Sequence, residues 1–139
     1  KLTIKDWPDR PPILLKFAPE IEKSELLELI QKAESWGVDG FVLTNTLGGE
    51  FQSKKGGWSG KVLTEASRTS LRTARYGTQL PVISVGGVMN EEIALDRMES
   101  GASLIQVYTG WIYQGPGFPA LLSRKLKNKT PKTTKAPDR

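Results

Sequence analysis

Two short segments carry the chemistry that residue types alone indicate most directly. Val85-Gly86-Gly87-Val88 closes one apolar run, and Val107-Tyr108-Thr109-Gly110 closes a later one. Glycines turn without steric cost and let backbone N–H groups approach an anion. Loops that follow strands, together with nearby helix starts, commonly hold a phosphate in this way. The pattern predicts a phosphate site, with simple turn geometry as the alternative for each glycine taken alone.

Polar residues also stand in or after two earlier apolar runs. Lys16 lies inside the run 13–18, where an unpaired ammonium is costly, so we expect it to face an anionic or electron-rich group. The alternative is a strand-end lysine that reaches water. Thr44, Asn45 and Thr46 end the run that begins at Gly40, a position where barrel enzymes gather active-site groups. Asn and Thr are equally typical of a turn.

The elements that must position these residues repeat one unit, an apolar run followed by a helical pattern. The runs are 13–18, 40–46, 81–88 and 102–109, and the helical patterns begin at Ser24, Thr64, Asn90 and Phe118. Ser24 and Asn90 are predicted helix caps, and Gly37 and Gly101 are predicted to follow helix ends. A glycine-rich loop is expected after residue 46. Continuous apolar strands between helices favour a parallel sheet covered by helices, and a doubly wound sheet fits as well.

Length and composition bound the answer further. The chain has 139 residues, whereas an eight-stranded β/α barrel needs about 250, so we expect part of a barrel. With 37% hydrophobic and 25% charged residues, global disorder is not expected. Cysteine and histidine are absent, which excludes disulfides, thiolate metal sites and the commonest general base. No metal site is predicted, and no apolar run approaches the roughly 20 residues that cross a bilayer.

The net charge of +5 is concentrated at the carboxyl end of the sequence. Residues 125–139 contain six basic side chains and one acidic side chain, and the remainder of the chain is balanced. No aromatic residue interleaves with these lysines, so we expect no nucleic-acid partner. The sequence therefore predicts one barrel unit over residues 1–126 and a basic, disordered tail over residues 127–139.

Six segments resemble dihydroorotate dehydrogenase in their order and approximate spacing. They are Leu15–Pro19, Leu43–Thr46, Gly56–Lys61, Val85–Val88, Gly101–Ser103 and Gln106–Gly110. The resemblance is strongest to the class 2, quinone-using branch and covers roughly residues 11–126. It implies an α/β fold, namely the C-terminal half of a TIM-type β/α barrel with about four βα units.

The resemblance also implies an activity and a set of site residues. The activity is FMN-dependent oxidation of dihydroorotate to orotate, with a quinone as acceptor, in de novo pyrimidine (UMP) biosynthesis. The implied FMN contacts are Lys16, Thr44, Gly60, Gly86, Gly87, Tyr108 and Thr109, and the implied orotate contacts are Asn45 and Thr46. A cation at Lys16 stabilises negative charge on a reduced flavin, and an asparagine amide matches the donor and acceptor edges of a pyrimidine.

Some implied features lie outside the resembling part or depart from it. The catalytic serine, the quinone channel and the segment that attaches the family to a bacterial or mitochondrial inner membrane belong to its N-terminal half. We therefore predict no catalytic residue here and do not assign that role to Ser59. The loop 47–55 is shorter than is usual for class 2, and Trp58 stands where leucine is typical.

We expect the chain to be a fragment whose partner is the N-terminal half of the same barrel. Alone it should aggregate, dimerise or stay partly molten, because two sheet edges and one sheet face lack cover. Two alternatives stay open. One is a non-catalytic flavin- or phosphate-binding half-barrel, and the other is a different phosphate-binding β/α-barrel enzyme, against which Lys16 and Asn45-Thr46 argue.

Overall fold

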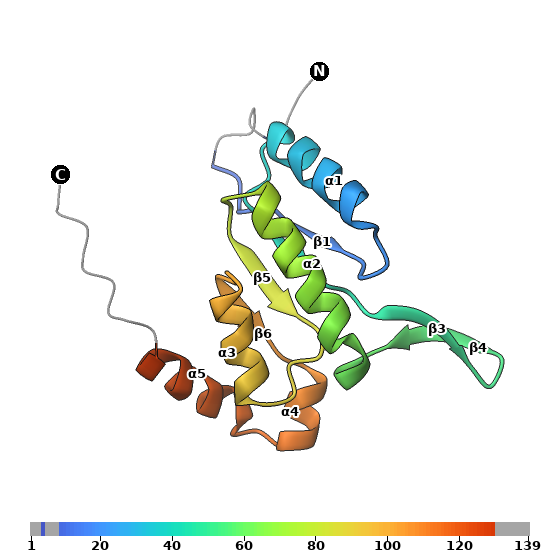
Figure 1. The fold of residues 1–139 in the computed structure, drawn as a ribbon, viewed down its shortest axis with the longest axis vertical. Coiled ribbons are helices and arrows are strands. Elements are labelled where there is room, and N and C mark those ends of the chain that lie inside the picture. The colour runs from blue at the N-terminus through green and yellow to red at the C-terminus, as the bar shows by residue number, and fades with distance from the viewer. Residues whose placement is uncertain (1–3, 5–8, 130–139) are drawn as a thin grey trace.

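A four-stranded parallel sheet organises the chain. The computed structural model describes residue 4 and residues 9–129. The sheet consists of β1 (Leu14–Phe17), β2 (Gly40–Leu43), β5 (Val82–Val85) and β6 (Leu104–Gln106), in the order β1-β2-β5-β6. The helices are α1 (Lys23–Trp36), the 3₁₀ helix η2 (Gly60–Leu63), α2 (Thr64–Gly77), α3 (Glu91–Glu99), α4 (Thr109–Gln114) and α5 (Phe118–Lys129). Figure 1 shows α1, α2 and α3 side by side over the sheet.

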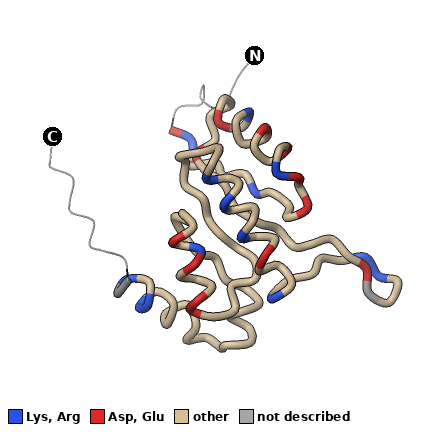
Figure 2. Tube along the Cα trace, in the orientation of Figure 1, with Lys and Arg blue, Asp and Glu red and all other residues tan. Residues whose placement is uncertain are grey.

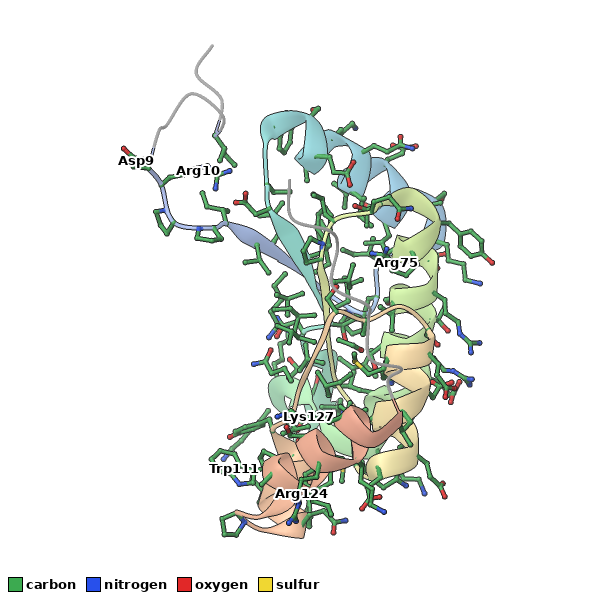
Figure 3. The ribbon with its side chains drawn as sticks, turned by 90° about the vertical axis from the view of Figure 1, so that its left-hand side faces the viewer. Asp9, Arg10, Arg75, Trp111, Arg124 and Lys127 are labelled. Carbon is green, nitrogen blue, oxygen red and sulfur yellow. The ribbon has the colours of Figure 1, made fainter. Side chains whose placement is uncertain are left out.

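The order of the strands decides between the two folds that the sequence allows. Neighbours in the sheet are also consecutive βα units along the chain, and α1, α2 and α3 lie on one side of the sheet (Figure 3). A doubly wound sheet reverses its strand order and carries helices on both faces. The observed arrangement is that of four consecutive units of a β/α barrel, which confirms the predicted fold class.

Alternate residues of the strands divide the sheet into two faces. Rows such as Leu15–Phe41–Val82 and Phe17–Leu43–Ser84 follow from the strand register and face the helices, where Phe41, Leu43 and Val82 are fully buried. Together with Leu26, Ile30, Leu71 and Ala74 of α1 and α2 they form the main core. The other face carries Leu14, Lys16 and Leu104, which are exposed. We call these the covered face and the open face.

Local chemistry sets most of the helix ends. Gly37 ends α1 in the left-handed region with φ of 93°, and the Asn90 side chain accepts a hydrogen bond from the Ile93 N–H at the start of α3, both as predicted. Gly101, with φ of 95°, follows α3 as predicted. The predicted cap at Ser24 is wrong, because α1 begins one residue earlier and Glu22 is its N-cap, without a side-chain hydrogen bond.

The expected glycine-rich loop after residue 46 is a β-hairpin. Strands β3 (Leu47–Phe51) and β4 (Lys54–Trp58) pair antiparallel, and the hairpin projects away from the other elements (Figure 1). Gln52 and Ser53 connect the strands with positive φ angles of 48° and 60°, as in a two-residue type I′ turn. Lys54 and Lys55 place basic charge at the hairpin tip (Figure 2).

The boundary predicted at residue 126 differs slightly from the observed helix end. Helix α5 continues to Lys129, three residues beyond that boundary. The rest of the predicted tail lies outside the described residues. None of the helices in the described ranges has the length and apolar content of a membrane span.

Candidate functional site

A pocket of about 210 Å³ opens at the carboxyl ends of the four parallel strands. Its lining combines the ends of β1, β2, β5 and β6 with the segment that joins the hairpin to α2. Every residue predicted to contact a flavin or a pyrimidine lines it: Lys16, Thr44, Asn45, Thr46, Gly60, Gly86, Gly87, Tyr108 and Thr109. The carboxyl ends of parallel strands meet at one edge of a sheet, which is why residues far apart in sequence gather here.

The turn after β5 is built from two glycines in the left-handed region. Gly86 has φ of 103° and Gly87 has φ of 71°. A Cβ atom on Gly87 would lie only 2.4 Å from the backbone nitrogen of Thr64 at the start of α2. This position therefore requires glycine both for its backbone conformation and for the close approach of the helix.

Side chains of α2 hold the carbonyl groups of this turn. The Ser67 hydroxyl donates to the Gly86 carbonyl at 2.7 Å, and the Thr64 hydroxyl donates to the Gly87 carbonyl at 3.0 Å. In a planar trans peptide the N–H points away from the C=O of the same unit. The N–H groups of Gly87 and Val88 are thus turned away from α2, and neither donates a hydrogen bond within the described part of the chain. Uncommitted N–H groups of this kind suit an anion.

Another part of the pocket lining is formed where the segment after the hairpin meets the start of α4. The Thr109 hydroxyl donates to the Ser59 hydroxyl at 3.0 Å. A Cβ atom on Gly60, which has φ of 82°, would lie 2.9 Å from Thr109 Cγ2. The side chain of Tyr108 is 66% exposed at the rim. Gly60 thus allows the close contact that brings two hydroxyl groups to the pocket wall.

Three consecutive residues after β2 differ in how deeply they are buried and in how many hydrogen bonds they make within the fold. Thr44 is buried, its N–H donates to the Val85 carbonyl at 2.8 Å, and its hydroxyl donates to the Asn45 carbonyl at 3.0 Å. The Asn45 N–H donates to the Phe17 carbonyl at 2.8 Å. The side chains of Asn45 and Thr46 are exposed. The backbone is therefore fixed to both neighbouring strands, while the amide and hydroxyl groups stay available to a ligand.

Lys16 lies on the open face, opposite Val42 in the strand register. Its side chain is exposed, as in the alternative of a lysine that reaches water, and its expected role beside an anionic or electron-rich group stays a prediction. The physical reason for the exposure is that no element among residues 9–129 covers that face. Lys16 still lines the pocket, and among the described residues its side chain makes no hydrogen bond or ion pair.

Several pocket residues were not predicted from the sequence. Gln106 ends β6 and lines the pocket beside Met89 and Leu63. A polar residue at a strand end was a usable signal for Gln106, whereas Met89 and Leu63 read as ordinary core residues. Within the described ranges, no group of three or more acidic side chains could hold a metal ion, which agrees with the residue types of the pocket.

Consecutive strand order, a single helical layer and a pocket at the carboxyl ends define part of a TIM-type β/α barrel. Residues 3–130 match the family model described as dihydroorotate dehydrogenase. The chain belongs to this family, as the resemblance of its motifs predicted.

Named relatives agree with the family model. The dihydroorotate dehydrogenase (quinone) of Pseudoalteromonas atlantica is 44% identical over 117 residues, covering 77% of this chain and 35% of the relative. The protein from Chelativorans with the same name is 38% identical, covering 83% and 34%. The mitochondrial protein of Mus musculus is 36% identical, covering 86% and 33%. The chain thus spans about a third of the length of these curated relatives.

Solved structures give the same result. The crystal structure of DHODH from Eimeria tenella in complex with ferulenol matches with a TM-score of 0.77 and 30% identity, over 86% of this chain and 34% of that one. The ligand-free form of that protein also gives a TM-score of 0.77, with 36% of its chain covered.

Proposed function

We propose that this chain supplies the flavin-phosphate site and part of the orotate site of an FMN-dependent dihydroorotate dehydrogenase that uses a quinone. The observation that carries the proposal is the gathering of all the expected contact residues on one pocket, next to the uncommitted N–H groups of Gly87 and Val88. Family membership gives the reaction class. When bound, FMN supplies the hydride acceptor for oxidation of dihydroorotate to orotate.

Each wall of the pocket suits a different part of the ligands. The Gly86–Gly87 turn and the hydroxyl pair of Thr109 and Ser59 suit the phosphate. Thr109 donates to Ser59, so the Ser59 proton and the backbone N–H groups are donors without a competing carboxylate. Lys16 stands where a cation would stabilise negative charge on the reduced ring system. The exposed Asn45 and Thr46 side chains suit the amide edges of the pyrimidine.

The size of the pocket argues that it is one part of a larger site. Ligand pockets usually measure roughly 300–1,000 Å³, whereas this one measures about 210 Å³. It suits the phosphate and the adjoining chain of the flavin better than the whole cofactor with its substrate. We infer that the remaining walls, the catalytic base and the quinone site belong to the N-terminal half of the same barrel.

The cellular setting is proposed by analogy. One relative is named as mitochondrial, and quinones are membrane-dissolved electron carriers. Association of the complete enzyme with a bacterial or mitochondrial inner membrane fits that acceptor.

A specific observation favours a second candidate, a half-barrel that binds flavin or phosphate without turnover. Apart from Lys16, the pocket lining holds only hydroxyl, amide and apolar side chains. A general base with a suitable pKa is therefore missing from the lining. The two candidates share the flavin site and differ in whether the complete protein oxidises dihydroorotate.

The visible absorption spectrum tests the shared site. The purified chain is mixed with FMN, freed of unbound flavin and compared with its Lys16→Ala variant. We expect retained flavin with a shifted spectrum in the wild type and a large loss in the variant. Lys61→Ala is the matched control, because Lys61 is an exposed lysine next to Gly60 that does not line the pocket.

Each outcome bears on the proposal. Equal loss in both lysine variants would reduce the role of Lys16 to general charge. Failure of the wild type to retain any flavin would contradict a cofactor site carried by this chain. If the flavin site holds, steady-state oxidation of dihydroorotate by the complete protein separates the enzyme from the non-catalytic alternative.

A further inference from the structure

Arg97 of α3 is a fully buried cation that the site described above does not use. Its exposure is 0%, the same as that of core residues such as Ile30 and Phe41. Arginine is almost never buried to this extent unless it is paired. The position therefore calls for a partner with negative charge or a set of strong acceptors.

No carboxylate fills that role among the described residues. The neighbouring Asp96 carboxylate accepts from Arg68 at 2.8 Å and lies 3.5 Å from Arg72, so it is already shared by two other guanidinium groups. Glu65 pairs with Arg68 at 3.7 Å. Burial lowers the pKa of Arg97, with only a partial opposing effect from Asp96. The cation is thus desolvated without a direct counter-ion.

The acceptors that Arg97 does have lie behind the pocket, and one of them, Gly86, lines it. Its Nη2 donates to the Thr64 carbonyl at 2.6 Å and, at 3.4 Å, to the Gly86 carbonyl, while Nη1 lies 3.4 Å from Ser84 Oγ. Arg97 Nε has no hydrogen-bond partner in the described part of the chain. One guanidinium therefore joins the start of α2 to the glycine turn after β5.

The peptide unit between Gly86 and Gly87 separates this cation from the pocket. Its carbonyl accepts from Arg97 and from Ser67, and its N–H points the opposite way. Donors on a carbonyl polarise the amide and make its N–H a stronger donor. A buried positive charge behind the amide also favours an anion in front of it, since the low-dielectric interior screens the charge weakly.

We propose that Arg97 is a positioning residue for a phosphate bound at the Gly86–Gly87 turn. It fixes the carbonyl groups of Gly86 in the turn and of Thr64 in α2. It also supplies a buried positive charge that a phosphate dianion compensates. This inference rests on the proposed function, because it concerns the same pocket. It adds a preference for phosphorylated over unphosphorylated flavin that comes from a residue outside the pocket lining.

The ratio of two affinities tests the proposal. The dissociation constants of FMN and riboflavin are measured by quenching of flavin fluorescence for the wild type, Arg97→Met and Arg97→Lys. We expect the wild type to prefer FMN, and Arg97→Met to reduce that preference by about tenfold or more, the scale of a hydrogen bond to a charged group. Arg97→Lys keeps the charge but not the planar fork, so it should retain more of the preference than Arg97→Met.

The ratio remains informative if a variant folds incompletely. Both ligands meet the same folded fraction, so a loss of folded protein weakens both apparent affinities equally. Arg75→Met is the matched control. Arg75 is a half-buried arginine of α2 that donates to the Leu80 carbonyl at 2.9 Å, and Figure 3 shows it well away from α4 and Trp111 at the pocket end.

Three results would overturn the proposal in distinguishable ways. A full FMN preference in Arg97→Met would reject the role of Arg97 while leaving the phosphate site intact. An equal loss in Arg75→Met would assign the effect to general positive charge. Absence of FMN preference in the wild type would reject the phosphate site itself, and the role of Arg97 with it.

Discussion

The two faces of the parallel sheet both carry large apolar side chains, yet they have very different surroundings. On the covered face Phe41, Leu43 and Val82 are completely buried beneath α1 and α2. On the open face Leu14 is 37% exposed and Leu104 is 61% exposed. Figure 3 shows α1, α2 and α3 on one side of the sheet and side chains without a covering helix on the other.

This difference shows that the strands carry apolar side chains on a face that no helix covers among residues 9–129. Strands buried on both faces read as continuous apolar runs, whereas strands with one wet face alternate. The runs here are continuous, although helices cover only one face within residues 9–129. The open face and the pocket share the carboxyl ends of the strands, so we infer that the layer which completes the core also completes the site.

The largest expected effect comes from removing a large side chain on the covered face. Phe41→Ala should lower the free energy of unfolding by about 3–5 kcal/mol, because it leaves a cavity and removes the stacked contact with Phe17, whose ring centre lies 5.9 Å away. Leu104→Ala on the open face is the matched variant, and at a protein concentration low enough to keep the chain monomeric its effect should stay within about 0.5 kcal/mol. Urea denaturation followed by circular dichroism measures both. Similar losses for the two variants would mean that the open face is covered in solution.

The contrast between these faces could be predicted only in part. Apolar runs, glycine punctuation and the Asn90 cap act locally, so they indicated four βα units and most helix ends. The predicted start of α1 differs from the observed one because Ser24 is a typical N-cap residue, whereas the N-cap in the structure is Glu22. The hairpin was missed because its strands are rich in glycine, and no Asn-Gly or Asp-Gly pair marks the turn.

The residues at and behind the pocket could likewise be predicted only in part. Gly86, Gly87 and Thr109 could be predicted because turn chemistry and motif order identify strand ends. Arg97 could not, since an arginine among the charged residues of α3 reads as solvent-exposed. Its burial depends on how α3 packs against α2 and β6, which no short segment specifies. For Lys16 the sequence allows two interpretations, an anionic neighbour or contact with water, and the side chain is exposed on the open face.

A second, smaller effect should appear in the association of the chain with itself. Leu14→Lys combined with Leu104→Lys puts charge on the open face and should shift the purified chain toward the monomer in sizing chromatography with light scattering. Tyr76→Lys is the control, because Tyr76 is 90% exposed on α2, away from the open face. An unchanged distribution in the double variant, or an equal shift in Tyr76→Lys, would contradict association through the open face.

The smallest expected effect is a change in the pH dependence of stability, and it comes from an ion pair at the amino ends of the strands. This pair holds the start of β1 next to β2, and β1 contributes side chains to both faces of the sheet. Arg10 pairs with Asp39, with Nη2 3.1 Å from Oδ1, and the Ile13 N–H donates to the same carboxylate at 2.7 Å. The hydrogen bonds from Arg10 and then from Ile13 hold the pKa of Asp39 below its usual value.

The sign of the pH dependence follows from that lowered pKa. The carboxylate contributes stability above the unfolded-state pKa of about 3.9, and the contribution is lost as pH falls through the lower folded-state value. Urea midpoints measured between about pH 5 and pH 2 should therefore fall more for the wild type than for Asp39→Asn. Glu28→Gln is the control, because it removes a carboxylate whose pair with Lys32 is long, at 4.0 Å, and exposed. The urea midpoints of this variant should fall with pH as much as those of the wild type. If Asp39→Asn also followed the wild type, the anchoring of β1 would rest on its backbone pairing with β2 instead of on this carboxylate.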